Sequence, residues 1–202
     1  MLDRWTLKII QSPLRQLADL LKKNDYNANQ VTIVGFSIGL ATIPVLAFHL
    51  YWLALTCIIL NRTFDGIDGA LARITATSEA GAYLDIVLDF IFYSAVVFGF
   101  VLAAPATNGL SGCALLFSFA GNGSSFLAFA IMAKEKKIKD VTYPQKGFYY
   151  LGGLTEGTET VICFTLFCLF PDYFPVLAFI FAGMCTLTAI FRVVYGFRTL
   201  AK

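Results

Sequence analysis

Long apolar stretches, separated by short polar connections, dominate the chain. Each is close to 20 residues long, the length that carries a helix across a hydrocarbon core of ~30 Å. Their side chains are apolar almost without interruption, whereas a membrane-spanning strand would alternate apolar and polar positions. We therefore predict an all-α fold, an integral membrane bundle of six transmembrane helices. The predicted helices are residues 31–50, 51–72, 82–104, 112–133, 149–170 and 174–195.

The first 28 residues have a different pattern. Apolar side chains recur there at helical spacing among basic ones, which is typical of an amphipathic helix lying along a membrane surface. Pro13 stands inside the pattern, and we expect it to break this helix in two. The segment is too charged for the core of a signal peptide, so we expect no cleavage. Two parts are predicted, a cytoplasmic juxtamembrane amphipathic segment at 1–28 and the six-helix transmembrane domain at 29–202.

Composition and charge support this interpretation. Of the 202 residues, 58% are hydrophobic and 14% are charged, which excludes a soluble domain with a solvated surface. Lysine and arginine gather at both ends of the chain and in every second loop, and the loops around His49, Thr107 and Asp172 hold none. Because such residues stay on the side that is not translocated, we expect both termini in the cytoplasm and the inner or plasma membrane of a bacterium. The net charge of +2 is a topology signal, and no nucleic acid partner is expected.

Four aspartates interrupt the second and third apolar stretches. Asp65 and Asp68 lie three residues apart near the end of the second, and Asp85 and Asp89 lie four residues apart near the start of the third. Each spacing places its two carboxylates on one face of a helix. The connection at 74–81 is short, so we expect these helices to be antiparallel neighbours. Both pairs should then converge near the cytoplasmic face.

Converging carboxylates repel one another, and a charge buried in a membrane is costly unless it is paired. Hard divalent cations relieve the repulsion, and oxygen ligands with positions left for phosphate suit Mg²⁺ or Mn²⁺. We predict that the four aspartates hold two such ions about 4 Å apart, which could clamp a pyrophosphate during a phosphoryl displacement.

Nearby residues fit a phosphate ligand as well. Gly66, Gly69 and Gly81 would let a diphosphate or a nucleotide approach the backbone closely, and Arg73 could contact a phosphate with both arms of its guanidinium. In the less specific interpretation, the acids form a proton relay or an ion pathway and the glycines serve helix packing. The spacing of all four acids favours the metal site.

These residues resemble the motif of the CDP-alcohol phosphotransferase family, D-x-x-D-G-x-x-A-R followed after a short gap by G-x-x-x-D-x-x-x-D. The gap at 74–80 has seven residues where the familiar pattern usually has eight, and we expect a shortened turn. Asn29 and Thr32 also resemble the family's P-N-x-x-T start of the first helix, with Ala28 in place of the proline. Every fixed position is present, at Asp65, Asp68, Gly69, Ala72, Arg73, Gly81, Asp85 and Asp89.

The resemblance implies a metal-dependent transferase of phospholipid biosynthesis. A phosphatidyl group, or a related substituted phosphate, would pass from a CDP-alcohol, expected to be CDP-diacylglycerol, to an alcohol, with release of CMP. Asp89 would be the general base, and the protein would pair as a homodimer among membrane lipids; small residues at Gly112, Gly121 and Gly123 would allow close helix approach. The residues implied around CDP are Gly66, Gly69, Ala72, Arg73, Gly81, Asn29 and Thr32.

The acceptor alcohol stays open. Glu156 and Glu159 lie early in the predicted fifth helix, where they could line a pocket for a hydroxyl-rich or cationic alcohol, or could simply favour the helix N-terminus. Asn122, Ser124, Ser125 and Arg192 could line the same cavity or satisfy one another. Serine, glycerol 3-phosphate, inositol or its phosphate and small amino-alcohols are candidate acceptors. The basic residues Lys134, Lys136, Lys137, Lys139 and Lys146 could contact anionic headgroups, set the topology or bind a phosphorylated acceptor.

Two further classes of protein compete with the transferase. One is a cation- or proton-coupled carrier that uses the four acids as a pathway, although such carriers usually show internal repeats and broken helices at the midplane. The other is a catalytically silent scaffold, which the intact set of four acids disfavours. The five cysteines all lie in predicted spans without metal-type spacing and are expected to serve as small apolar side chains.

Overall fold

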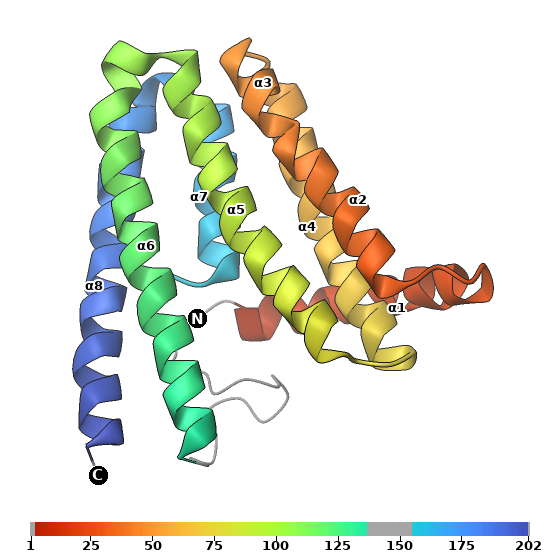
Figure 1. Cartoon of the computed structure of the whole chain (residues 1–202). Coiled ribbons are helices and arrows are strands. Elements are labelled where there is room, and N and C mark those ends of the chain that lie inside the picture. Colours follow the sequence, from red (N-terminus) through yellow and green to blue (C-terminus); the bar gives the residue numbers. More distant parts are fainter. Residues whose placement is uncertain (1–2, 137–154, 202) are drawn as a thin grey trace.

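Helices are the only regular elements in residues 3–136 and 155–201, the parts of the chain that the computed structural model describes (Figure 1). The prediction of an all-α fold is confirmed. In chain order the helices are α1 (Asp3–Lys23), α2 (Ala28–Leu40), α3 (Thr42–Ala47), α4 (Tyr51–Ile74), α5 (Glu79–Ala103), α6 (Pro105–Glu135), α7 (Gly157–Leu169), a short 3₁₀ turn (Pro171–Tyr173) and α8 (Phe174–Leu200).

Four helical stretches in the described ranges are long and apolar enough to cross a membrane: Ala28–Ala47, Glu79–Ala103, Pro105–Glu135 and Pro171–Leu200. Helix α4 is also long, but its second half carries the charged side chains of the acidic motif, and α7 has only 13 residues. The structure therefore describes a membrane protein. Six complete spans and a cytoplasmic location of both termini stay predictions.

Several boundaries differ from the predicted ones. The first predicted span is divided at Ala41 into α2 and α3, and α2 begins earlier than expected. At this start Asn27 caps the helix, since its side-chain oxygen accepts a hydrogen bond from the Asn29 backbone N–H at 3.0 Å and its own backbone N–H donates one to Gln30 Oε1 at 3.0 Å. The start of the predicted 149–170 span and Lys137, Lys139 and Lys146 lie outside the described residues.

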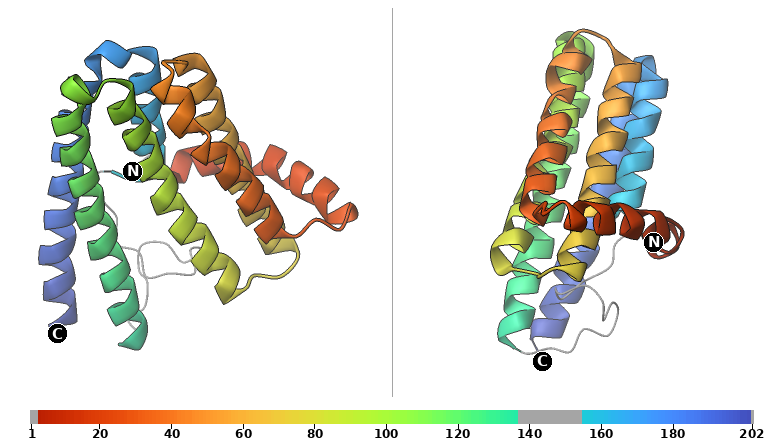
Figure 2. Two further views of the ribbon diagram at one scale, coloured as in Figure 1. Left: turned by 45° about the horizontal axis from the view of Figure 1, so that its top comes forward. Right: turned by 90° about the vertical axis from the view of Figure 1, so that its right-hand side faces the viewer.

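Helix α1 is one continuous helix through Pro13, so the predicted break there is wrong. Proline removes one backbone hydrogen bond, and packing of α1 across α4 compensates for that loss. Leu14 and Ala18 face α4, where Gly66 provides the space for Leu14, and Lys22 Nζ donates a 2.8 Å hydrogen bond to the Ile74 carbonyl at the end of α4. In Figure 2, α1 lies across the other helices. Its contact with a membrane surface stays a prediction.

Aromatic side chains fill the centre of the bundle. Phe92 and Phe100 of α5 pack with Phe164 and Phe167 of α7 and with Phe174 at the start of α8, and all are almost completely buried. Phe100 and Phe174 stack with ring centroids 4.8 Å apart. Many large apolar side chains on the outer faces remain exposed, as expected of a surface that faces lipid.

Two of the glycines expected to allow dimer packing are used within the chain. A side chain at Gly112 would collide with Val101 of α5, and one at Gly123 would lie 2.6 Å from Phe90 of α5. Gly121 is exposed and has only Ala189 nearby. The close approach that these glycines permit is therefore chiefly the one between α5 and α6, and the homodimer stays a prediction.

We expect Gly112→Val to destabilise the bundle, because the added side chain has to displace Val101. Overpacking of this kind costs about 1–3 kcal/mol, which corresponds to a fall in Tm of roughly 5 °C. Thermal unfolding of the protein in detergent measures the effect. Gly109→Val in the same helix is the control, since nothing lies within 4 Å of the added atom. Equal losses of Tm in both variants would contradict this packing.

Candidate active site

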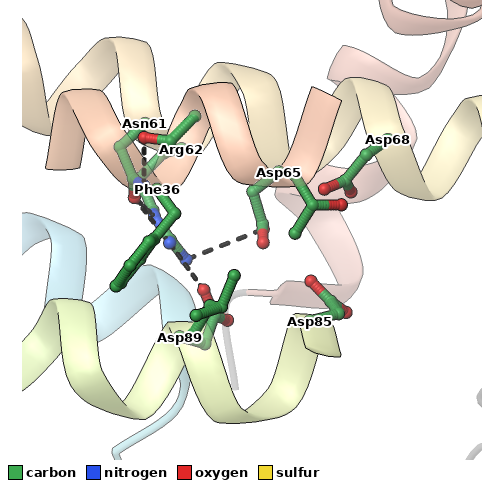
Figure 3. A pocket seen from close by; sticks show the side chains of 10 residues that line it. Phe36, Asn61, Arg62, Asp65, Asp68, Asp85 and Asp89 are labelled. Carbon is green, nitrogen blue, oxygen red and sulfur yellow. Dashed lines mark hydrogen bonds and ion pairs between the residues drawn. The ribbon is translucent and has the colours of Figure 1, made fainter. Parts of the chain in front are cut away.

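The four aspartates come together where α4 and α5 face each other near the short connection between them (Figure 3). The backbones of α4 and α5 approach each other closely at few positions, and the two helices meet through side chains, with α2 packed against both. Thr32, Gly35 and Phe36 of α2 form one wall of the resulting pocket. This spacing leaves room for the four carboxylates between the two backbones.

Three of the four carboxylates form a compact ligand set. One oxygen each from Asp65, Asp68 and Asp85 lies within 4.8 Å of the others. Asp68 is only 5% exposed, and its Oδ2 atom has no hydrogen-bond partner among the described residues. A buried carboxylate oxygen without a partner is costly, so these residues fit a hard divalent cation such as Mg²⁺ or Mn²⁺.

The fourth aspartate has a different partner. Asp89 Oδ1 accepts a 2.6 Å hydrogen bond from Arg62 Nη2, and Arg62 Nη1 lies 3.6 Å from Asp65 Oδ2 (Figure 3). Arg62 therefore bridges the two helices between these two acids. Asp89 lines the same pocket as the three-carboxylate set but lies outside that set.

A shell of neighbours fixes Arg62 in place. Its Nε and Nη2 atoms donate to Asn61 Oδ1 at 2.9 and 2.6 Å, and its Nη1 donates to the Tyr93 hydroxyl at 3.2 Å. Asn61 is held in turn by a 2.9 Å bond from its Nδ2 to the Gly35 carbonyl of α2. The guanidinium carbon also lies 4.6 Å from the centre of the Phe92 ring. A charged group in an apolar bundle needs hydrogen-bond and ion-pair partners of this kind.

Sequence reasoning named neither Arg62 nor its neighbours Asn61 and Tyr93. A signal was present, because an arginine within an apolar helix, three residues before an intramembrane aspartate, points to a functional ion pair. Its partner Asp89 lies 27 residues away in sequence, and only the fold brings the two together.

The residues implied around CDP occupy several places. Thr32 lines the carboxylate pocket, and a side chain at Gly81 would lie 3.0 Å from the Asn29 amide oxygen. Gly81 also donates its backbone N–H to the Ser78 hydroxyl, which caps α5.

The other four residues follow along α4. A side chain at Gly69 would lie 3.4 Å from the exposed Arg73 guanidinium, and Ala72 is half-buried. Gly66 faces Leu14 of α1. Gly66 lies where α1 crosses α4.

A second, larger cavity of about 150 Å³ lies on the other side of α5. Phe90 and Tyr93 of α5 line it together with residues of α6, α7 and α8. Because Tyr93 also bonds to Arg62, one side chain connects the carboxylate pocket to this cavity. Among its polar lining, Arg192 Nη1 donates a 2.7 Å hydrogen bond to Asn122 Oδ1, and both Arg192 and Glu156 are 7% exposed.

The two glutamates that were predicted together form one capping box at the start of α7, in which the Glu156 side chain accepts from the Glu159 backbone N–H and Glu159 Oε2 accepts a 3.2 Å hydrogen bond from the Glu156 backbone N–H. Glu156 is also buried and lines the cavity, whereas Glu159 is only half-buried. Asn122 and Arg192 also line the cavity, while the hydroxyls of Ser124 and Ser125 bond to carbonyls of their own helix.

Comparison with known proteins assigns the chain to a family. The family model for CDP-alcohol phosphatidyltransferase matches residues 26–194. The chain therefore belongs to the CDP-alcohol phosphatidyltransferase family.

Its relatives include characterised members. The inner membrane protein YnjF of Escherichia coli is 50% identical over 200 residues, which are 99% of this chain and 97% of that protein. The archaetidylinositol phosphate synthase of Pyrococcus horikoshii is 29% identical over 141 residues, 64% of this chain and 74% of that enzyme.

The fold is also that of a solved enzyme. The phosphatidylinositol phosphate synthase PgsA1 of Mycobacterium tuberculosis, crystallised with CDP-DAG bound, gives a TM-score of 0.73 at 18% identity and covers 91% of this chain and 92% of its own. The same enzyme in complex with manganese and citrate gives a TM-score of 0.72 at 19% identity, with 91% and 88% covered. At this level of identity the similarity establishes the architecture alone.

We expect Asp68→Asn to raise the Tm of the metal-free protein, because it removes a buried charge whose Oδ2 has no partner. The same variant should lose most of the rise in Tm that Mn²⁺ gives the parent protein, since ligand binding stabilises only a protein that binds. Thermal unfolding with and without Mn²⁺ measures both effects. Asp19→Asn on the exposed face of α1 should behave like the parent. A full Mn²⁺ response in Asp68→Asn would contradict the ligand assignment.

Proposed function

We propose that this protein transfers a phosphatidyl, or related substituted phosphate, group from CDP-diacylglycerol to an alcohol and releases CMP during phospholipid biosynthesis. The observation that carries the proposal is the three-carboxylate set of Asp65, Asp68 and Asp85, with its buried unpartnered oxygen, in a member of this family. The CDP-DAG bound to the structurally similar PgsA1 supports the choice of donor.

The residues of the pocket divide the chemistry between them. Asp65, Asp68 and Asp85 would hold Mg²⁺ or Mn²⁺, which supplies positive charge against the diphosphate oxygens when it is bound. Asp89 is the proposed general base. Arg62 binds its Oδ1, so the proton of the acceptor hydroxyl would pass to Oδ2 as the alcohol oxygen attacks the β-phosphorus. The bond from that phosphorus to the CMP oxygen breaks in the same displacement.

The nucleotide would lie beside the carboxylates. Thr32 lines the pocket, Asn29 and Gly81 lie beside each other at the starts of α2 and α5, and Gly69, Ala72 and Arg73 follow along the last turns of α4. Arg73 is exposed and could contact a phosphate of CDP. Gly66 belongs to the proposed set by its place in the motif, and its packing against Leu14 would couple α1 to the nucleotide side.

The acceptor would enter through the cavity beyond α5. That cavity holds a buried carboxylate, Glu156, and a buried guanidinium, Arg192, within one polar wall, and aromatic rings form much of the rest. Such a lining suits a small alcohol with several hydroxyls or with charges of both signs. Tyr93 stands between this cavity and Arg62, so an acceptor hydroxyl directed past Tyr93 would reach Asp89.

The same proposal covers the membrane, the orientation and the oligomeric state of the protein. We propose a bacterial inner or plasma membrane with both termini in the cytoplasm, supported by the distribution of lysine and arginine and by the similarity to an inner membrane protein. A homodimer is proposed from the family alone. Six membrane crossings would result if α4 and α7 span together with the four long apolar stretches.

We expect the purified protein to release CMP from CDP-diacylglycerol when Mg²⁺ or Mn²⁺ and one alcohol from a panel are present. The panel contains serine, glycerol 3-phosphate, inositol, inositol phosphate and small amino-alcohols. Asp89→Asn should lower kcat by at least about 100-fold, because asparagine cannot take the proton of the acceptor, although its oxygen can still accept the hydrogen bond from Arg62. Metal-independent release, or full activity of Asp89→Asn, would contradict the proposal.

We expect Glu156→Gln to raise the KM for the acceptor by about tenfold and to leave the KM for CDP-diacylglycerol nearly unchanged, because the lost charge faces the second cavity. Glu159→Gln is the matched control, since glutamine still offers an oxygen to the Glu156 backbone N–H. Steady-state kinetics with each substrate varied separately would show the difference. A change confined to the donor KM would place the acceptor elsewhere.

A further inference from the structure

Arg62 stands at the position where a second metal ion would be expected. Asp89 lies outside the compact set, so a second divalent ion would have to bind Asp89 together with one carboxylate of that set. Asp65 is the one that contacts the same arginine as Asp89. The guanidinium of Arg62 already lies between them, 2.6 Å from Asp89 Oδ1 and 3.6 Å from Asp65 Oδ2. The positive charge between these two acids is therefore supplied by an arginine side chain of the protein (Figure 3).

Arg62 and a second metal ion would lie against the same two carboxylates. Arg62 already occupies Asp89 Oδ1, so the ion would have to bind the remaining oxygens, at about 2.0–2.1 Å for Mg²⁺ and close to the guanidinium. Two positive charges at such separations repel strongly in a partly buried site. Arginine cannot relieve this by losing its proton, because its guanidinium stays charged in proteins. A second ion would therefore bind weakly unless Arg62 moved away.

The neighbours of Arg62 oppose such a movement. Its side chain is 15% exposed, donates to Asn61 Oδ1 through two nitrogens and to the Tyr93 hydroxyl through a third, and lies over the Phe92 ring. Displacement would leave the Asn61 oxygen and the Tyr93 hydroxyl without these bonds. It would also move a charge through apolar side chains, so the arginine is held as a fixed cation.

The remaining carboxylates suffice for one ion. Asp65, Asp68 and Asp85 offer three oxygens within 4.8 Å, and an octahedral Mg²⁺ needs only a few protein ligands beside phosphate and water.

We propose that Arg62 replaces the second divalent ion, so that each chain binds one Mg²⁺ or Mn²⁺ at Asp65, Asp68 and Asp85. Arg62 is then a positioning residue that supplies fixed positive charge between Asp65 and Asp89 and orients Asp89 for the acceptor. The inference rests on the proposed function and differs from the sequence-based prediction of a site with two ions. It concerns how many ions bind, which can be measured without turnover.

Electron paramagnetic resonance of Mn²⁺ titrated into the purified full-length protein tests this directly, because two ions a few ångströms apart give a coupled spectrum and one ion does not. We expect one tight Mn²⁺ per wild-type chain with an uncoupled spectrum. Arg62→Gln should bind a second Mn²⁺ at least about tenfold more tightly than wild type and show coupling. Arg62→Lys, which keeps the positive charge, should stay at one ion.

The controls separate this inference from the proposed function. Arg15→Gln, an exposed arginine on α1, should keep the wild-type stoichiometry. Two coupled ions in wild type would overturn the inference, and so would a single ion in a folded Arg62→Gln variant. Should Arg62→Gln not fold, the wild-type count still decides. A failure of the proposed function would look different, with no Mn²⁺ bound or with CMP release that needs no metal.

Discussion

Compensation of negative charge inside an apolar bundle is the constraint on which the rest of this structure depends. Four carboxylates face one pocket between α4 and α5, and water is too scarce at such a site to solvate them all. The fold packs α2 against both helices and places Arg62 of α4 beside Asp89 of α5. Asp68 Oδ2 has no hydrogen-bond partner among the described residues, and the free-energy cost of this buried, unpaired oxygen favours binding of a cation in the pocket.

The part of this arrangement that could be predicted from sequence is the part with local periodicity. Spacings of three and four residues place Asp65 with Asp68 and Asp85 with Asp89, and uninterrupted apolar stretches predict helices. The pairing of Arg62 with Asp89 could not be predicted in this way, because it depends on the distance and rotation between two helices.

Local rules also failed where tertiary packing opposed them. Pro13 favours a helix break by itself, but α1 runs through it while packing on α4. Glu156 and Glu159 look equivalent in sequence and share one capping box at the start of α7, yet Glu156 lines the cavity and Glu159 does not. Their separate roles required knowledge of which face meets α5, α6 and α8.

The bond between Arg62 and Tyr93 has a consequence for how this family can diverge. Positions 61, 62, 89 and 93 form one connected unit, since Asn61 and Tyr93 hold the arginine that holds Asp89. A relative that loses the arginine leaves an asparagine and a tyrosine without their partner and adds one net negative charge to the pocket. Positions 61, 62 and 93 should therefore change together during evolution while the motif keeps Asp89, and the residue at position 62 would divide family members into two electrostatic types.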